Sequence, residues 1–283
     1  MNSDSTLLQG IKIVSVALNA PGPVAAARLT NLGADVTKIE PPNGDATKSA
    51  APEWYEALCQ GQTVLRLDLK SPYGRMQLDD LLGQADLLLA SFRPSALQRL
   101  GLDWESLHAR HPRLCFVGIV GYTAPFAERT GHDLTYQCDV GLLRPPQMPP
   151  TLFIDLAGAE RAVSMALALL NRAARRGHAG CAWVSLHECA RDLAEPLKAG
   201  LTTSSGLLGG GYPLYGFYRA SDGWIAIATL EPHFAEKLLS ELGLKQADRT
   251  ALEKIFRQRK AESWEKWATE LDLPLVAVRE AGS

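Results

Sequence analysis

Four side chains of this sequence have the type and setting for acid–base or anion-binding chemistry: Arg93, His132, Asp155 and Glu231. An imidazole titrates near neutral pH, so His132 suits a general base. A carboxylate held at a helix start can act as a base or as a nucleophile toward an acyl group. The planar donor fork of Arg93 suits a phosphate. Each residue also has a plain structural use: His132 as a loop hydrogen-bonder, Asp155 and Glu231 as helix caps, and Arg93 as a surface charge.

The first 120 residues contain the elements that must position these groups. Apolar runs at 11–17, 86–90 and 114–120, an alternating run at 63–69, and the segment 35–40 predict five strands. Helical stretches separate them, and Ser71-Pro72 supplies the cap and first residue of one helix. Strand–helix alternation predicts a mostly parallel sheet covered on both faces, with ligands beyond the carboxyl ends of its strands. Arg93 and His132 follow the fourth and fifth strands.

A different pattern begins after residue 121. Residues 156–176 predict one long helix with Asp155 as its N-cap and Gly177 just past its end, an arrangement that favours the ionised form of Asp155. The Gly/Ser-rich stretch 204–211 indicates a mobile lid or a linker. Two strands around Ser221-Asp222-Gly223 predict a hairpin. We therefore expect a large domain over 1–203 and a small domain of hairpin plus helices over 204–283.

Composition excludes several classes of protein. Lys and Arg total 29 against 31 Asp and Glu, a balance unfavourable to nonspecific nucleic-acid binding. No apolar run has the length of a membrane span, and the polar N-terminus lacks a signal peptide. Five dispersed cysteines without a CxxC pair predict reduced thiols, hence a cytoplasmic location, and neither a disulfide framework nor a thiolate metal site. No metal is expected at His187-Glu188 either, because Arg191 occupies the place of a second histidine.

The first strand–turn–helix unit disfavours a nicotinamide or flavin cofactor. Glu40 ends the second strand, where an acidic residue could bind a ribose. The preceding turn, however, is Asn19-Ala-Pro-Gly-Pro23 and not GxGxxG. Its prolines remove backbone donors that would hold a pyrophosphate.

An ordered set of short motifs resembles the class III CoA-transferase family (CaiB/BaiF type), which includes the α-methylacyl-CoA racemases. The motifs are LGADVTKIEPP (32–42), LDLK (67–70), SFRP (91–94), RLGL (99–102), GHDLTY (131–136), DLAG (155–158) and YRASDGWIAIATLEPHF (218–234). The resemblance implies an interlocked homodimer, a Rossmann-like large domain with a smaller α+β domain, and CoA thioesters as ligands. It implies no cofactor beyond the coenzyme A of the substrate.

The resemblance also implies roles for individual residues. Asp155 matches the transferase nucleophile, which in the racemase branch pairs with the histidine matched by His132, and Glu231 matches the partner of that histidine. Arg93 matches an arginine beside CoA. Lys38, in the first motif, and Gly209 and Gly210, in a stretch similar to the family's active-site loop, are further predicted CoA-binding residues.

Three activities follow from these matches. Two bases on opposite faces of a thioester α-carbon suffice for racemisation, so His132 with Glu231 favours proton transfer on a 2-methyl-branched acyl-CoA. Asp155 alone could instead start CoA transfer between an acyl-CoA and a carboxylic acid through an aspartyl acyl-enzyme. The third is a non-catalytic CoA-binding homologue. It is suggested by the short segment from His132 to Asp155, by an unusual loop before His132, and by a chain end at Ser283 where family members usually continue.

Overall fold

The computed structural model describes residues 6–279, which form two compact units divided between Leu193 and Ala194. The division falls before the predicted boundary at 203/204. The segment expected to be a linker is wound tightly onto the residues preceding it, and Leu208 N donates to Leu201 O at 2.9 Å. A Cβ at Gly209 would overlap Thr203 O, so only glycine permits this approach. The chain from Ala194 onward therefore belongs with the second unit.

The first unit contains a six-stranded parallel sheet in the order β3-β2-β1-β4-β5-β6. Its strands are β1 (Lys12–Ser15), β2 (Asp35–Glu40), β3 (Thr63–Arg66), β4 (Leu87–Ala90), β5 (Cys115–Val120) and β6 (Cys181–Ser185). This is the Rossmann order: β1 to β3 are added toward one edge of the sheet, and β4 to β6 are added toward the other edge, starting next to β1. The predicted parallel α/β sheet is confirmed. The edge strand β6 was not expected from the sequence.

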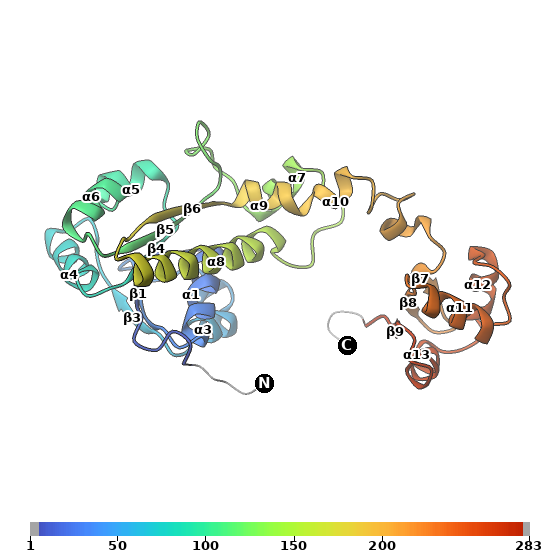
Figure 1. Cartoon of the computed structure of the whole chain (residues 1–283). Coiled ribbons are helices and arrows are strands. Elements are labelled where there is room, and N and C mark those ends of the chain that lie inside the picture. Colours follow the sequence, from blue (N-terminus) through green and yellow to red (C-terminus); the bar gives the residue numbers. More distant parts are fainter. Residues whose placement is uncertain (1–5, 280–283) are drawn as a thin grey trace. The chain divides into compact units, whose positions relative to one another are not determined.

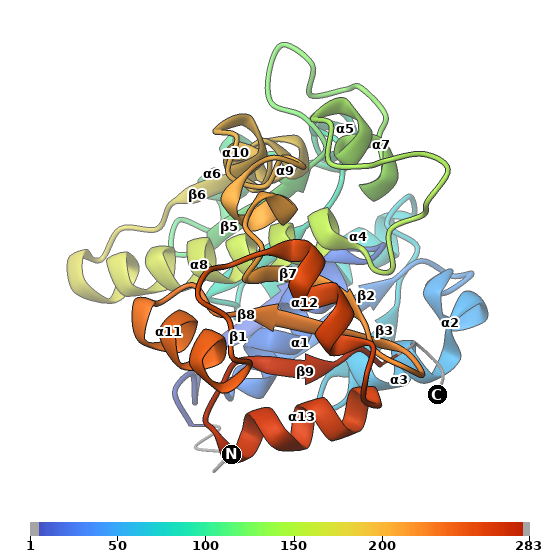
Figure 2. The same cartoon turned by 90° about the vertical axis from the view of Figure 1, so that its right-hand side faces the viewer.

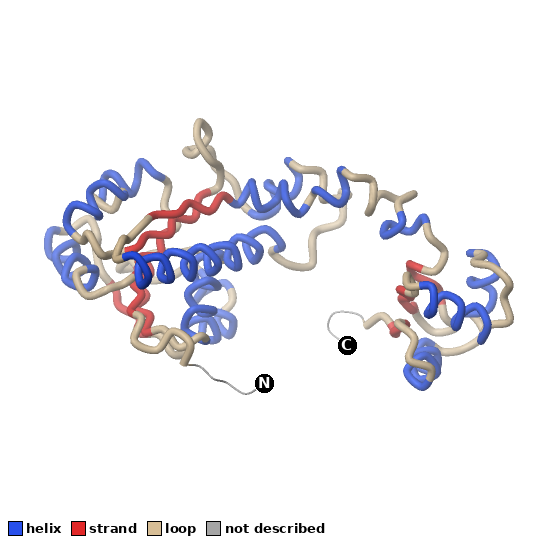
Figure 3. Tube along the Cα trace, viewed as in Figure 1, coloured by secondary structure: helices blue, strands red, loops and turns tan. Residues whose placement is uncertain are grey.

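Helices cover both faces of this sheet (Figures 1 and 3). Both faces must be covered because the apolar side chains of β4 point alternately to one face and to the other. Leu87 and Leu89 belong to the apolar cluster on one face of the sheet, and Leu88 and Ala90 belong to the cluster on the other face. The helices of this unit are α1 (Pro21–Asn31), α2 (Thr47–Ala50), α3 (Pro52–Cys59), α4 (Pro72–Leu82), α5 (Pro94–Leu100), α6 (Trp104–Arg110), α7 (Asp133–Asp139), α8 (Phe153–Arg176) and α9 (Leu186–Leu193). Sheet and helices thus form three layers.

Two local features explain how these layers are held. The predicted cap of α4 is confirmed, because Ser71 Oγ accepts a hydrogen bond from Gly74 N at 3.0 Å. Gly22, at the start of α1, lies so close to β1 that a Cβ there would overlap the Cβ of Ala17. The glycine therefore lets the start of α1 approach the residues that directly follow β1.

The second unit surrounds an antiparallel sheet in the order β7-β8-β9 (Figure 2). Its elements are α10 (Glu195–Lys198), the irregular turn η1 (Leu207–Gly211), β7 (Tyr215–Arg219), β8 (Trp224–Ala228), α11 (Pro232–Glu241), α12 (Arg249–Phe256), α13 (Ala261–Glu270) and β9 (Leu275–Ala277). The predicted hairpin is β7–β8, and the three-residue β9 was not foreseen. Among residues 6–279, no helix combines the length and apolar character needed to cross a membrane.

Candidate active site

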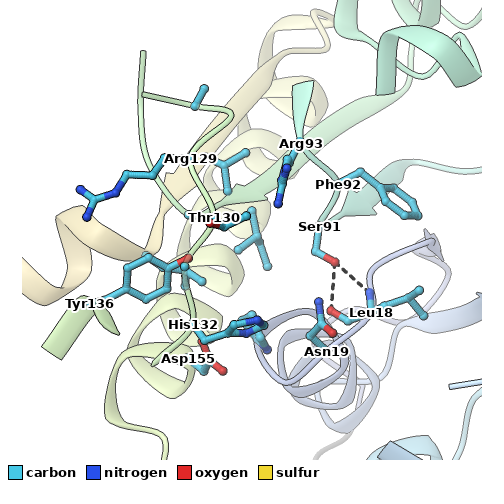
Figure 4. A pocket seen from close by; sticks show the side chains of 17 residues that line it. Leu18, Asn19, Ser91, Phe92, Arg93, Arg129, Thr130, His132, Tyr136 and Asp155 are labelled. Atoms are coloured by element: carbon cyan, nitrogen blue, oxygen red, sulfur yellow. Dashed lines mark hydrogen bonds between the residues drawn. The ribbon is translucent and has the colours of Figure 1, made fainter. Parts of the chain in front are cut away.

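A cavity of about 200 Å³ opens at the carboxyl ends of β1, β4 and β5, beside the point between β1 and β4 where the strand order reverses. Leu18 and Asn19 line it from the turn after β1, and Arg93 lines it after β4. His132 and Asp155 line the same cavity, from the starts of α7 and α8 (Figure 4). The fold therefore brings together three of the predicted site residues, at the place where doubly wound sheets bind ligands.

Asp133 joins the two helices that carry His132 and Asp155. It is 4% exposed, and its Oδ1 accepts hydrogen bonds from the backbone N–H groups of Ile154 at 2.7 Å and Asp155 at 3.0 Å. Its other oxygen accepts from the side-chain amide of Gln137. The first turn of α8 is thus capped by a carboxylate from α7, which fixes the spacing between the two helix starts.

The predicted capping role of Asp155 is wrong. The helix begins at Phe153, so Asp155 is its third residue and Leu152 occupies the N-cap position. With the backbone donors bound by Asp133, the Asp155 carboxylate makes no hydrogen bond within the described residues. Burial, and secondarily the negative charge of Asp133, raise the pKa of Asp155 to about 7. The expectation of a firmly ionised carboxylate is therefore also wrong: this acid changes protonation near neutral pH.

His132 is the N-cap residue of α7 and is held through its backbone. Its N–H donates to Thr135 Oγ1 at 2.9 Å, and the Thr135 hydroxyl donates back to His132 O at 2.8 Å. The two residues form a capping box at the start of α7. The imidazole lies beside Asp155 at the base of the cavity in Figure 4. Backbone anchoring with the ring in the cavity favours a chemical role over loop fixation.

Arginine and serine side chains complete the opposite wall. Arg93, the N-cap of α5, is exposed and points down into the cavity in Figure 4. Arg129 points away from the cavity centre in the same view and pairs with Asp139 at 3.3 Å. Ser91 Oγ accepts from Leu18 N at 2.8 Å and donates to Leu18 O at 3.0 Å, tying the end of β4 to the turn after β1. Arg93 is therefore available to an anion.

Lys38 does not line this cavity. It is 1% exposed, and its Nζ lies 2.9 Å from Glu40 Oε1 and 2.7 Å from Asp45 Oδ2. Tyr55 donates a hydrogen bond to the same Glu40 oxygen at 2.8 Å and places its ring 4.7 Å from the Lys38 ammonium. The ammonium is engaged inside the protein, so the structure does not offer Lys38 to CoA as the sequence suggested.

Glu231, Gly209 and Gly210 belong to the second unit. Glu231 is the exposed N-cap residue of α11, and its partnership with His132 stays a prediction. Gly209 and Gly210 lie in η1, where Gly210 has φ +110° and its carbonyl accepts from Arg249 at 2.6 Å. Their predicted CoA contacts also stay predictions.

Sequence reasoning missed two further residues at the site, Asp133 and Tyr136. Both lie inside the GHDLTY motif, so position within the motif was the available signal for them. Tyr136 is 2% exposed and lines the cavity one helical turn after His132. A side chain at Gly121 or at Gly131 would overlap the Tyr136 ring or hydroxyl. The two glycines therefore make room for a large aromatic residue at the cavity wall.

A Rossmann-ordered sheet with a histidine–aspartate pair and an arginine at its switch point defines an α/β protein equipped for acid–base chemistry on an anionic ligand. The sequence profile of CoA-transferase family III matches residues 8–283, and the chain belongs to this family. Human α-methylacyl-CoA racemase is 32% identical over 84% of the chain. The cinnamoyl-CoA:phenyllactate CoA-transferase of Clostridium sporogenes is 28% identical over 86% of it. The family's enzymes thus include both racemases and transferases.

The chain spans 65% of the length of the human racemase and 66% of that of the clostridial transferase. Among solved structures, a CaiB/BaiF family protein from Brucella suis is similar with a TM-score of 0.80 and 26% identity, over 96% of this chain and 84% of that one. A Mycobacterium tuberculosis protein, Rv3272, matches with a TM-score of 0.82 at 24% identity, over 97% of this chain and 84% of that one. These likenesses confirm the α/β architecture expected for the family.

Proposed function

We propose that this protein transfers the α-proton of an acyl-CoA thioester, as a racemase or epimerase of 2-methyl-branched acyl groups. The observation that carries the proposal is that His132 and Asp155 line one cavity at the carboxyl ends of the sheet strands. One group would remove the proton from the carbon beside the thioester, and the other would return a proton on the opposite face.

The electrostatics of Asp155 support proton transfer. A pKa of about 7 lets the carboxyl both accept and give up a proton at neutral pH, as a two-base reaction in either direction demands. A nucleophilic carboxylate, in contrast, must be ionised to attack a thioester. Near neutral pH a raised pKa lowers the ionised fraction, and this favours the racemase over the transferase.

The surroundings of the cavity support a long anionic ligand. A second cavity, of about 450 Å³, lies beyond β2 and β3 and shares Leu18 and Phe92 with the first. Lys70 lines the second cavity and Arg93 the first, so a cation is available along each part of an extended ligand. We propose that the CoA moiety follows this path with its phosphates near these cations. The reaction needs no cofactor beyond the coenzyme A of the substrate.

CoA transfer is the second candidate activity. Its support is the free carboxyl of Asp155 together with relatives named as CoA-transferases, such as the succinate–glutarate CoA-transferase of Agrobacterium fabrum, 33% identical over 46% of this chain. In this reaction Asp155 would attack the thioester carbon, expel the CoA thiolate and form an acyl anhydride. The CoA thiolate would next attack the Asp155 carbonyl of this anhydride, release the donor carboxylate and leave CoA as a thioester on Asp155. The acceptor carboxylate would then attack that thioester to form a second anhydride, and the thiolate would return to its acyl carbon, which yields the new acyl-CoA and frees Asp155.

One incubation in deuterated water separates the candidates. With a 2-methylacyl-CoA and no acceptor acid, proton transfer places deuterium at the α-carbon, which mass spectrometry detects. His132→Ala should slow this exchange at least about 100-fold, whereas His108→Ala, a histidine stacked on Trp104 in α6, should not. Exchange at the wild-type rate in His132→Ala would refute the two-base assignment. Label-free substrate together with an acyl group trapped on Asp155 after adding an acceptor acid would establish transfer instead.

The resemblance also leads us to propose a homodimer, with Glu231 and the glycine turn η1 contributing to the site. Light scattering on the purified protein tests the oligomeric state. Glu231→Gln should lower α-proton exchange without weakening CoA binding if its carboxylate orients His132, and unchanged exchange would remove it from the site.

A further inference from the structure

Tyr136 lies on the cavity side of α7, four residues after His132. Its N–H donates to His132 O at 3.1 Å, so the two residues stand one above the other on the helix. The close approach of Gly121 and Gly131 confines the ring from two sides. Tyr122 packs against it edge to face, with ring centroids 5.4 Å apart. The ring is therefore fixed, and so is the direction of its hydroxyl.

The hydroxyl of Tyr136 has no hydrogen-bond partner among residues 6–279, although its residue is 2% exposed. Its neighbour Tyr122 is equally buried but donates to Asp139 at 2.8 Å and carries Arg129 4.6 Å above its ring. The Tyr136 oxygen is not itself fully buried, so it is the part of this side chain that reaches the cavity, where a ligand atom can become its hydrogen-bond partner. In Figure 4 the Tyr136 oxygen is directed into the cavity, on the side of His132 and Asp155.

We propose that Tyr136 is a further catalytic residue, whose hydroxyl donates a hydrogen bond to the thioester oxygen of the substrate. This inference rests on the proton-transfer function proposed above. One base breaks the α-C–H bond and takes the proton, and the electron pair moves into the thioester to leave negative charge on its oxygen. The Tyr136 O–H bond stays intact and stabilises that charge, and the second base then returns a proton to carbon.

The surroundings keep this hydroxyl protonated. Burial, and then the charges of Tyr122 and Asp155, raise the pKa of Tyr136 to about 12. At working pH it is therefore a donor and not a phenolate. A neutral donor at this position is strengthened by the low polarity of its surroundings, because water is largely excluded around it.

The test compares Tyr136→Phe with Tyr122→Phe. Both changes remove one hydroxyl from a buried ring, but only the first removes a hydroxyl that faces the cavity. The loss of a donor to a developing oxyanion lowers turnover roughly 100-fold, so we expect that decrease in α-deuterium exchange for Tyr136→Phe, with KM little changed. Tyr122→Phe should exchange at close to the wild-type rate.

A second measurement does not depend on turnover. Infrared difference spectra of a bound acyl-CoA labelled with carbon-13 at the thioester carbonyl report a hydrogen bond to that oxygen as a shift to lower wavenumber. The shift should be present in wild type and Tyr122→Phe and lost in Tyr136→Phe. Equal spectra and equal exchange rates in all three proteins would overturn the role of Tyr136. A shift lost in Tyr136→Phe while the wild type exchanges no label would uphold the contact and overturn the proton-transfer function.

Discussion

Replacing Asp155 by Asn should stabilise the protein, and the gain should depend on pH. Folding raises the pKa of this carboxyl from 3.8 to about 7, chiefly through burial. In wild type, the folded state therefore holds a proton that the unfolded chain releases above its own pKa. The stability that comes from protonated Asp155 is complete below pH 3.8 and declines until the pH passes about 7. Asparagine resembles the protonated acid and carries no such dependence.

The magnitude follows from the pKa change. At about 1.4 kcal/mol per unit of pKa, an increase of about three units corresponds to about 4 kcal/mol. The free energy of unfolding of Asp155→Asn should therefore match wild type near pH 4 and exceed it by up to about 4 kcal/mol at pH 8. Urea denaturation at a series of pH values measures this difference, and carbon-13 titration of the Asp155 carboxyl measures its pKa directly.

Asp103 provides a control of opposite sign. It caps α6 by accepting from Ser106 N at 3.0 Å, and this bond lowers the pKa of its carboxyl. Its contribution to stability is present above the unfolded pKa and is lost as the pH falls. Asp103→Asn should thus cost most at neutral pH and least in acid. A pH-independent difference between wild type and Asp155→Asn, alongside the expected Asp103 behaviour, would refute the raised pKa and the acid–base role built on it.

Three other changes test the remaining assignments. Arg93→Ala should weaken CoA binding roughly 10- to 100-fold in calorimetry, since a charged hydrogen bond contributes about 1.5–3 kcal/mol. Arg110→Ala removes a guanidinium that pairs with Asp79 and should leave the affinity unchanged, and equal affinities of the two variants would remove Arg93 from the site. Lys38→Met should lower the free energy of unfolding by about 3–5 kcal/mol by leaving two buried carboxylates without their cation. Lys48 is exposed, so Lys48→Met serves as the control and should change the free energy of unfolding little. An equally small change for Lys38→Met would contradict the buried ion pairs. Ser71→Ala should cost about 1 kcal/mol by removing the α4 cap, and urea midpoints equal to wild type would contradict that role.

Local pattern was enough to predict the strands whose environment is uniform. β4 and β5 are buried apolar runs and β2 is a mostly buried strand, and the sequence places each of the three within a residue of its observed start. β6 differs, because Cys181 and Trp183 are exposed at the sheet edge and give no alternation of the usual kind. β9 has three residues and is defined by pairing with β8. Long-range pairing, and not the local sequence, makes these two segments strands.

The site residues likewise divide into those that the local sequence could predict and those that depend on contacts made in the folded chain. His132, Asp155 and Arg93 could be predicted to converge, since each lies near the carboxyl end of a strand or at a neighbouring helix start. The raised pKa of Asp155 could not, because it comes first from burial in the folded chain and then from the charge of Asp133. Asp133 also takes the backbone donors that a capping Asp155 would have used. Lys38 was misassigned because a motif does not reveal which side chains become buried. Glu40 lies two residues further along the same strand, but the ion pair with Asp45 forms only when the loop after β2 folds back over Lys38.

The hydrogen bonds from Asp133 to the start of α8 hold together two segments that lie more than twenty residues apart in the sequence. Because these hydrogen bonds join α7 directly to α8, the two helix starts are aligned without help from the connecting stretch at 140–152. Residues 142–150 line a different cavity from the one that holds His132 and Asp155. Deletions or additions in this stretch can therefore reshape that other cavity while the Asp133 bonds keep the starts of α7 and α8 at the same distance.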